Sequence, residues 1–494
     1  MVIPLALAAF THLWNPIGFP PGPLYDESIY LRRAMHLLEG HGPQESEFYD
    51  HPFFGQLFLA ATLRTIDYPH SLHPSVGDVH SIEMLWLIPR LLMGILAVVD
   101  TFLIYKISEW RYNRTVAVIA AILFAVMPIS WLTRWVLLDS ILLPFLLLSI
   151  LFAVYLNSRK NNNNNSSKKI PLTLISGIFL GLAIFTKIPA FVMIPVIGFL
   201  IYTSNNGNKS LKTLGLWLIP VVLIPVIWPT YAMSVDQLYL WVDGIYTQTH
   251  RGKQTLFYSI NYDFKIDSML PIFGMAGLVF AAIRRDLFLV LWAIPFLIFL
   301  YVIGFVSYWH FIPLIPAFCI AAARLIVGLP NRISNKKIHV QKTLPFIITS
   351  VIGIFGLVST IMLISTSNNN PYFKAAAFVP QYLQKIKNND SNHVDSTYYK
   401  LTIIANPFYL WVPQYVFHLD HDYIGYYDNT TVKTKKLLSI LDEGFVQALN
   451  NHQAASQIEQ LQANSNIYNS SRIAAFEENN YNNRISIYLY QIKK

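Results

Sequence analysis

The sequence predicts an α-helical polytopic membrane protein with about eleven transmembrane helices and a small extracytoplasmic C-terminal domain of mixed α/β structure. Of the 494 residues, 54% are hydrophobic and only 13% are charged, whereas soluble globular domains have about 25% charged residues. Apolar stretches that suit about 30 Å of hydrocarbon recur throughout residues 1–365. Residues 366–494 are instead polar and rich in asparagine. We therefore expect a transmembrane core over 1–365 and a separate domain over 366–494.

The apolar stretches of the core set the expected order of the spans. The first is short for a span, and the boundaries near residues 130–136 and 187–189 are tight hairpins. We expect spans at residues 1–14, 82–105, 115–130, 136–156, 171–187, 189–203, 214–232, 269–283, 287–306, 311–328 and 344–365.

Lys and Arg residues predict the orientation of these spans, because short basic loops are retained in the cytoplasm. The opposite side then receives the long loop 15–81, the segment 233–268 and the C-terminal domain. Basic residues in the loops assigned to the cytoplasm are Lys106, Arg111, Arg114, Arg159, Lys160, Lys168, Lys169, Lys209, Lys212, Arg284, Arg285, Arg332, Lys336, Lys337 and Lys342.

The net charge of +9 is scattered in small clusters between apolar runs, so it does not indicate a nucleic-acid partner. The single cysteine, Cys319, lies in an apolar segment and excludes an intramolecular disulfide. In the C-terminal domain, the stretches LTIIANPFYLWV and ISIYLYQI are typical of buried strands.

Four polar groups stand out against the apolar background, and all are expected at the extracytoplasmic face. Convergence on one face is a stronger signal than any single motif. The groups are Asp26 with Glu27, the stretch Tyr49–Gln56 with Asp50 and His51, the stretch Arg134–Asp139, and Lys187 together with Tyr308 and His310.

Each group also has a purely structural interpretation. Asp26 can cap a helix, Asp50 with His51 and Pro52 can form a turn, and Arg134 or Lys187 can extend to the interface. His310 can belong to an aromatic belt.

Asp139 is harder to explain in this way. It lies about 7.5 Å deeper than Arg134 along a helix, where a carboxylate costs about 2.5–3.5 kcal/mol. It also lies about 140° around the helix from Arg134. We therefore expect another partner for Asp139 and treat it as a functional candidate.

Acids and cations gathered at an outer membrane interface suit sugar transfer from a lipid-linked donor. Cations would hold the lipid phosphate and stabilise its charge as the sugar–phosphate bond breaks. A carboxylate would take the proton from the attacking hydroxyl of the acceptor.

An acidic pair after the first span, then Asp50-His51-Pro52…Gly55, then Arg134…Leu137-Leu138-Asp139 resembles the protein O-mannosyltransferases of glycosyltransferase family 39. More broadly, the chain resembles the GT-C glycosyltransferases that use polyprenyl- or dolichyl-phosphate sugars. The stretches GLAIFTK, ending at Lys187, and YWHFIPLIPAF, beginning at Tyr308, also resemble family segments. The resemblance covers about residues 1–330.

The resemblance implies a role for each matching residue. Asp26 would be the catalytic base, and Glu27 would orient the acceptor or the base in a single inverting displacement. Arg134, Lys187 and His310 would bind the donor phosphate. Lining the cavity or meeting the acceptor would be Asp50, His51, Asp139 and Tyr308.

Two departures from the family pattern affect the substrate. Phe53 and Gln56 stand where the family usually has proline and lysine, so one phosphate contact is lost or moved. The C-terminal domain resembles those of prokaryotic relatives that modify proteins or glycolipids, so both acceptors stay open, with mannose as the family default. A divalent metal ion is also left open; its ligands would be Asp26, Glu27, Asp50 and His51.

The alternative from another class is a polytopic transporter of a polar or lipid-linked substrate. Many transporters contain internal repeats with paired broken helices, and the sequence has none that we recognise. A third alternative is an assembly factor without catalysis, against which the retained Asp26 and Arg134 argue.

Overall fold

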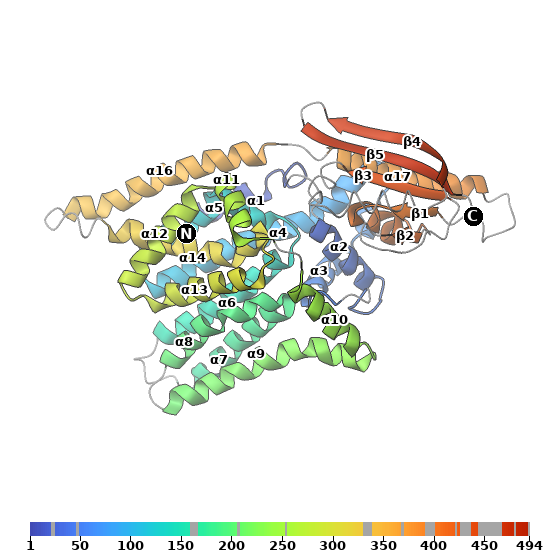
Figure 1. Ribbon diagram of the computed structural model, residues 1–494. Helices are drawn as coiled ribbons and strands as arrows, with labels where there is room; N and C mark the ends of the chain where they lie inside the picture. The colour runs from blue at the N-terminus through green and yellow to red at the C-terminus, as the bar shows by residue number, and fades with distance from the viewer. Residues whose placement is uncertain are drawn as a thin grey trace. The chain divides into compact units, whose positions relative to one another are not determined.

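The computed structural model describes residues 1–20, 25–45, 49–158, 166–204, 208–251, 254–329, 338–366, 370–390, 401–419, 422–424, 436–442, 467–478 and 481–492 (Figure 1). The chain forms two compact units. We call them the helical unit, which contains Met1–Trp14, Gln44–Phe58 and Leu91–Ile364, and the mixed unit, which contains Asn15–Pro43, Leu59–Arg90 and Ser365–Lys494.

The helical unit is built from apolar helices, and each of the eleven predicted segments overlaps a helix. Helices α3 (Phe54–Arg64) and α4 (Val79–Arg111) each include residues of both units. The other elements of the helical unit are α1 (Val2–Leu13), α5 (Arg114–Val126), η2 (Pro128–Arg134), α6 (Leu138–Ser158), α7 (Ser166–Thr186), η4 (Ile188–Met193), α8 (Ile194–Thr203), α9 (Asn208–Ser234), α10 (Leu238–Thr249), α11 (Leu256–Ile266), α12 (Met269–Ile283), α13 (Leu287–Ile303), η5 (Tyr308–Leu314), α14 (Ile315–Gly328) and α16 (Ile338–Ile364).

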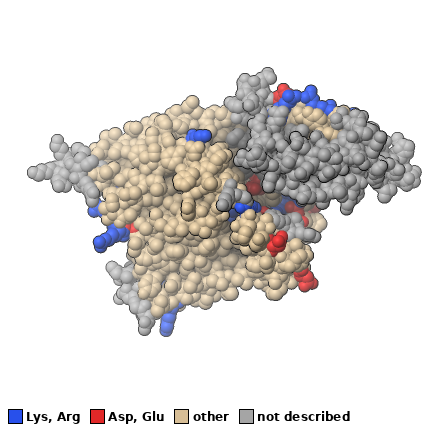
Figure 2. All heavy atoms as spheres, viewed as in Figure 1, with Lys and Arg blue, Asp and Glu red and all other residues tan. Residues whose placement is uncertain are grey.

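Within the described residues, six helices are long and apolar enough to cross a membrane, or up to eight if each bent pair is one span. The predicted number of about eleven is therefore not confirmed. Three predicted spans correspond to shorter apolar helices: Val2–Leu13, Ile188–Thr203 and Leu287–Ile303. The surface agrees with a multi-pass membrane protein, because the helical unit in Figure 2 is mostly uncharged. Exposed side chains of α9 include Ile219, Val222, Leu223, Val226 and Ile227.

Glycines allow α7 and α9 to pack closely, which fixes the end of α7. A Cβ on Gly177 would lie 2.5 Å from the carbonyl oxygen of Trp217, and one on Gly181 would lie 2.6 Å from that of Pro220. Small residues four apart are a common basis for helix packing in membranes. Lys187 follows directly after α7, so this packing helps to position it.

The mixed unit contains a five-stranded sheet of order β2-β1-β3-β5-β4 among its described residues. Strand β1 is parallel to both β2 and β3, whereas β5 is antiparallel to both β3 and β4. The bounds in this unit are α2 (Tyr25–Leu38), η1 (His70–Leu72), α17 (Asn370–Asp390), β1 (Leu401–Ile404), η7 (Pro407–Tyr409), η8 (Val412–Val416), β2 (Asp422–Ile424), β3 (Lys436–Asp442), β4 (Ile467–Glu478) and β5 (Tyr481–Ile492).

The expected mixed α/β character of the C-terminal residues is confirmed, but one strand prediction is partly wrong. In LTIIANPFYLWV only Leu401–Ile404 is a strand, and the chain then forms the short helices η7 and η8. Pro407 and Pro413 explain the change, because proline cannot donate a hydrogen bond to a sheet. The stretch ISIYLYQI does lie in β5.

Candidate functional site

A buried ion pair joins two of the predicted polar groups. Asp139 lies in the first turn of α6, and Lys187 follows α7; the distance between Lys187 Nζ and Asp139 Oδ2 is 2.6 Å. Both side chains are only 6% exposed. Asp139 therefore has the separate partner that its position requires, and that partner is Lys187.

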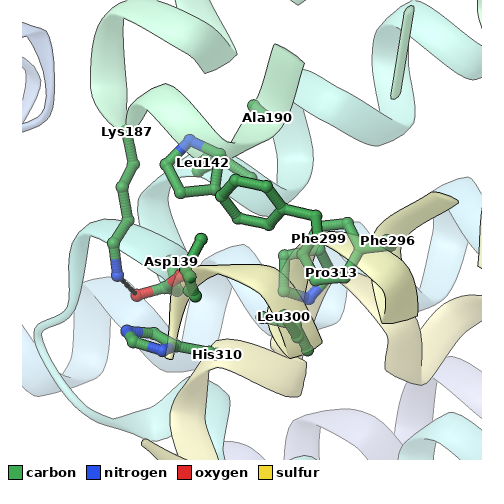
Figure 3. Close-up of a pocket in the computed structure, with 11 residues that line it drawn as sticks. Asp139, Leu142, Lys187, Ala190, Phe296, Phe299, Leu300, His310 and Pro313 are labelled. Atoms are coloured by element: carbon green, nitrogen blue, oxygen red, sulfur yellow. Dashed lines mark hydrogen bonds and ion pairs between the residues drawn. The ribbon is translucent and has the colours of Figure 1, made fainter. Parts of the chain in front are cut away.

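This ion pair lies at the polar side of a cavity (Figure 3). His310 is on the same side, whereas the rings of Phe296 and Phe299 extend across the other side. The remaining lining residues are Leu142, Pro189, Ala190, Leu300, Ile303 and Pro313. The cavity thus offers a cation and an imidazole beside an apolar surface.

His310 is the centre of a positively charged region. Lys187, His51 and Arg251 are all close enough to act electrostatically on its ring. The backbone N–H of Ser307 donates to His310 Nδ1 at 3.2 Å, so in the neutral imidazole Nε2 carries the proton. Three of the predicted residues, His51, Lys187 and His310, are therefore brought together, and sequence reasoning missed the fourth, Arg251.

Gly55 brings the second motif to the ion pair. A Cβ at this position would lie 3.0 Å from Thr186 Cγ2 and would collide with a methyl group of Leu138. These two neighbours directly precede Lys187 and Asp139, so only glycine allows α3 to approach the pair this closely. At the start of the same motif, Asp50 Oδ1 accepts the backbone N–H of His51 at 2.8 Å, which agrees with the predicted turn.

Arg134 lies at the end of η2 and is only 1% exposed, so it does not extend to the interface. Its guanidinium donates a hydrogen bond to the carbonyl oxygen of Trp14. It also acts electrostatically on His12 of α1. The structure thus places Arg134 against the end of α1, and its predicted phosphate contact stays a prediction.

The acidic pair belongs to the mixed unit, in the first turn of α2, where acids suit the positive end of the helix dipole. Asp26 is partly exposed, whereas Glu27 is fully buried. Glu27 accepts two hydrogen bonds from Arg90, from Nε at 2.9 Å and from the second guanidinium nitrogen at 2.8 Å. Arg90 also donates to the carbonyl oxygen of Pro16 at 3.0 Å. This bidentate pair fixes the helix turn that carries Asp26.

Sequence reasoning missed Arg90, although a signal was present. It is a lone arginine in the apolar segment 82–105, and an ionisable residue in such a segment is a functional candidate by default.

The metal possibility finds no ligand cluster in the described part of the chain, where no three His, Cys, Asp or Glu side chains are grouped to hold an ion. Of the four candidate ligands, Glu27 is already paired with Arg90.

Tyr308 does not line the cavity with His310. Its ring stacks on Tyr262 of α11, with the ring centroids 4.2 Å apart. This contact draws α11 into the candidate site.

The comparisons with known proteins agree with this geometry. Residues 84–232 match the family model described as dolichyl-phosphate-mannose-protein mannosyltransferase. No curated protein matches the chain in sequence at a significant level.

Two solved structures cover nearly the whole chain. ArnT from Cupriavidus metallidurans, bound to undecaprenyl phosphate, is 11% identical with a TM-score of 0.63, over 99% of this chain and 97% of that one. The archaeal oligosaccharyltransferase AglB from Archaeoglobus fulgidus, in complex with an inhibitory peptide and a dolichol-phosphate, is 13% identical with a TM-score of 0.60, over 97% and 74%. The fold is therefore that of the GT-C glycosyltransferases.

Proposed function

We propose that this chain transfers a sugar from a polyprenyl- or dolichyl-phosphate donor to a hydroxyl acceptor on the extracytoplasmic face of a membrane. The observation that carries the proposal is the cavity in which Lys187, Asp139 and His310 lie beside Phe296 and Phe299. A lipid-linked phosphate has this combination of an anionic head and an apolar tail. The lipid phosphates bound to ArnT and AglB support the same donor class.

The donor phosphate would bind at the polar side of the cavity. The buried pair of Lys187 and Asp139 has no net charge, and Asp139 holds the ammonium in a fixed position. An added phosphodiester brings one negative charge, which the positive region around His310 and Arg251 stabilises. The phenylalanine rings then face the first units of the polyprenyl chain.

Asp26 is the proposed catalytic base, because it is the partly exposed member of the acidic pair. As the acceptor oxygen forms its bond to the anomeric carbon, its proton passes to the Asp26 carboxylate. The bond between that carbon and the phosphate oxygen breaks, and the electron pair leaves with the lipid phosphate. Glu27, held by Arg90, keeps this turn of α2 in place.

The experiment measures transfer of radiolabelled mannose from polyprenyl-phosphate mannose in membranes that contain wild type or Asp26→Asn at equal levels. Loss of a general base lowers the rate by about 10²- to 10⁴-fold. Division of the product into protein and lipid fractions then identifies the acceptor.

Wild-type transfer that is lost in Asp26→Asn supports the proposal, whereas equal transfer by both proteins removes Asp26 as the base. Absence of wild-type transfer from a panel of polyprenyl-phosphate sugars, with protein and glycolipid acceptors supplied, would contradict the proposed activity and favour the transporter alternative.

A further inference from the structure

Helix α11 has the reverse of the usual amphipathic pattern. Its buried residues are Ser259 and Asp263, and Asp267 directly after the helix is also only 4% exposed. Phe257 and Tyr258, in contrast, are 73% and 57% exposed. A helix with its apolar side outward and its polar side inward suits a position between lipid and a polar interior. The buried face therefore needs polar partners.

Asp267 has such partners. Its Oδ1 accepts the backbone N–H groups of Met269 and Leu270, both at 3.0 Å, at the start of α12. Its Oδ2 accepts the N–H of Ile129 at 3.4 Å, from η2. Asp267 is thus explained by its structural role.

Asp263 is not explained in this way. It is 4% exposed, and its Oδ1 has no hydrogen-bond partner within the described segments. Two further buried atoms of the neighbouring η2 region share this condition: Ser130 Oγ and Trp135 Nε1, in residues that are 1% and 2% exposed. Since a buried polar group without a hydrogen bond is costly, three of them around α11 and η2 indicate a ligand with both donors and acceptors.

Aromatic rings connect these atoms. Tyr262, next to Asp263, stacks on Tyr308, whose ring centroid is 5.9 Å from that of Trp135. Trp135 in turn lies 4.6 Å from Trp131. A flat ligand with C–H faces and hydroxyl edges fits such a set, in which a few polar groups fix orientation among aromatic surfaces.

The position of this cluster relative to the cavity points to a particular ligand. Tyr308 and His310 are both in η5, and two residues of a 3₁₀ helix rise by about 4 Å. A group attached to a phosphate near His310 therefore comes within reach of Tyr308 and α11. In a lipid-linked donor, that group is the sugar.

We propose that Asp263, Ser130 and Trp135, with the rings of Tyr262 and Tyr308, form the subsite for the hydroxylated ring of the transferred sugar. Asp263 accepts hydrogen bonds from sugar hydroxyl groups, and Trp135 Nε1 donates one to a sugar oxygen. This inference rests on the proposed function and adds the residues that distinguish a sugar-bearing donor from the bare lipid phosphate.

The test compares two dissociation constants for purified protein in detergent. One is for polyprenyl phosphate, and the other is for polyprenyl-phosphate donors that carry mannose, glucose or N-acetylglucosamine. The variants are Asp263→Asn, Asp263→Leu and Trp135→Phe, and the matched control is Asp243→Asn, an exposed acid in α10. We expect wild type and control to bind at least one sugar donor more tightly than the bare phosphate. Asp263→Leu should weaken that donor by about 10- to 100-fold and leave the bare phosphate unchanged.

Two results would overturn the subsite. One is an equal loss of both ligands in all three variants, which would mark a structural role, and the other is wild-type binding that does not distinguish the sugar donors from polyprenyl phosphate. Wild-type protein that binds none of these ligands would instead contradict the proposed function, and the subsite would be rejected with it.

Discussion

Lys187 donates a hydrogen bond to Asp139 over 2.6 Å, although the two residues are 48 positions apart in the sequence. The pair ties the end of α7 to the first turn of α6 at the edge of the apolar cavity. Each partner alone would be a charge buried among apolar side chains.

Asp139→Asn should destabilise the protein by about 3–5 kcal/mol, because it leaves the Lys187 ammonium buried without a counterion. A lower melting temperature in detergent would report the loss. The matched control is Glu109→Gln, which weakens the more exposed pair with Lys106; it should cost less than about 1 kcal/mol. Equal shifts for the two variants would show that burial of the Asp139 pair has no energetic consequence.

Gly55→Val should reduce both stability and sugar transfer, since the added atoms would displace Leu138 and Thr186. Overpacking of this kind costs about 1–3 kcal/mol, and here it would also move Asp139 and Lys187. Gly215→Ala in α9 is the control, because a Cβ there meets nothing within 4 Å. Transfer at the wild-type rate by a folded Gly55→Val protein would contradict the packing argument.

Arg90→Leu should destabilise the protein by about 3–5 kcal/mol, because Glu27 would be left as an unpaired buried carboxylate. Adding Glu27→Met should restore much of this loss, since two apolar side chains can replace a buried ion pair. Sugar transfer should stay low in the double variant if Glu27 acts in the acceptor site. Thermal melts and transfer assays on the same four proteins measure both effects, and recovery of transfer along with stability would reduce Glu27 to a structural role.

Asp78 should make stability depend on pH. The Ser81 hydroxyl and backbone N–H lower the pKa of the Asp78 carboxyl, which caps the start of α4. Because the folded pKa lies below the unfolded value of about 3.9, the contribution is present above that value and is lost as pH falls through the folded pKa. Asp78→Asn should therefore melt below wild type at pH 7, and the difference should shrink toward pH 3. A difference that does not change with pH would assign the effect to packing.

The sequence predicted the positions of the helices well, because a long apolar run has few other solutions in a membrane. It did not predict the number of spans, since α1 and α13 are apolar but short. At the C-terminal end, hydrophobicity alone suggested a strand where Pro407 and Pro413 favour helical turns.

The candidate site was predicted residue by residue but not pair by pair. Burial of Asp139 required a partner, yet the choice of Lys187 depends on how α6 packs against α7. The pairing of Glu27 with Arg90 likewise joins residues 63 positions apart. Asp263 was missed because residues 233–268 were expected to be an outer loop, in which an acid is normally solvated.

The close packing of α7 on α9 has a consequence for how damage to this protein would be distributed. Gly181 is six residues before Lys187, which is about 9 Å along a helix. A larger side chain at Gly181 would meet the backbone of α9 and push α7 aside. The ammonium of Lys187 would then move away from Asp139, although no residue of the cavity had changed. Inactivating substitutions in a random screen should therefore collect along this helix seam as well as around the ligand.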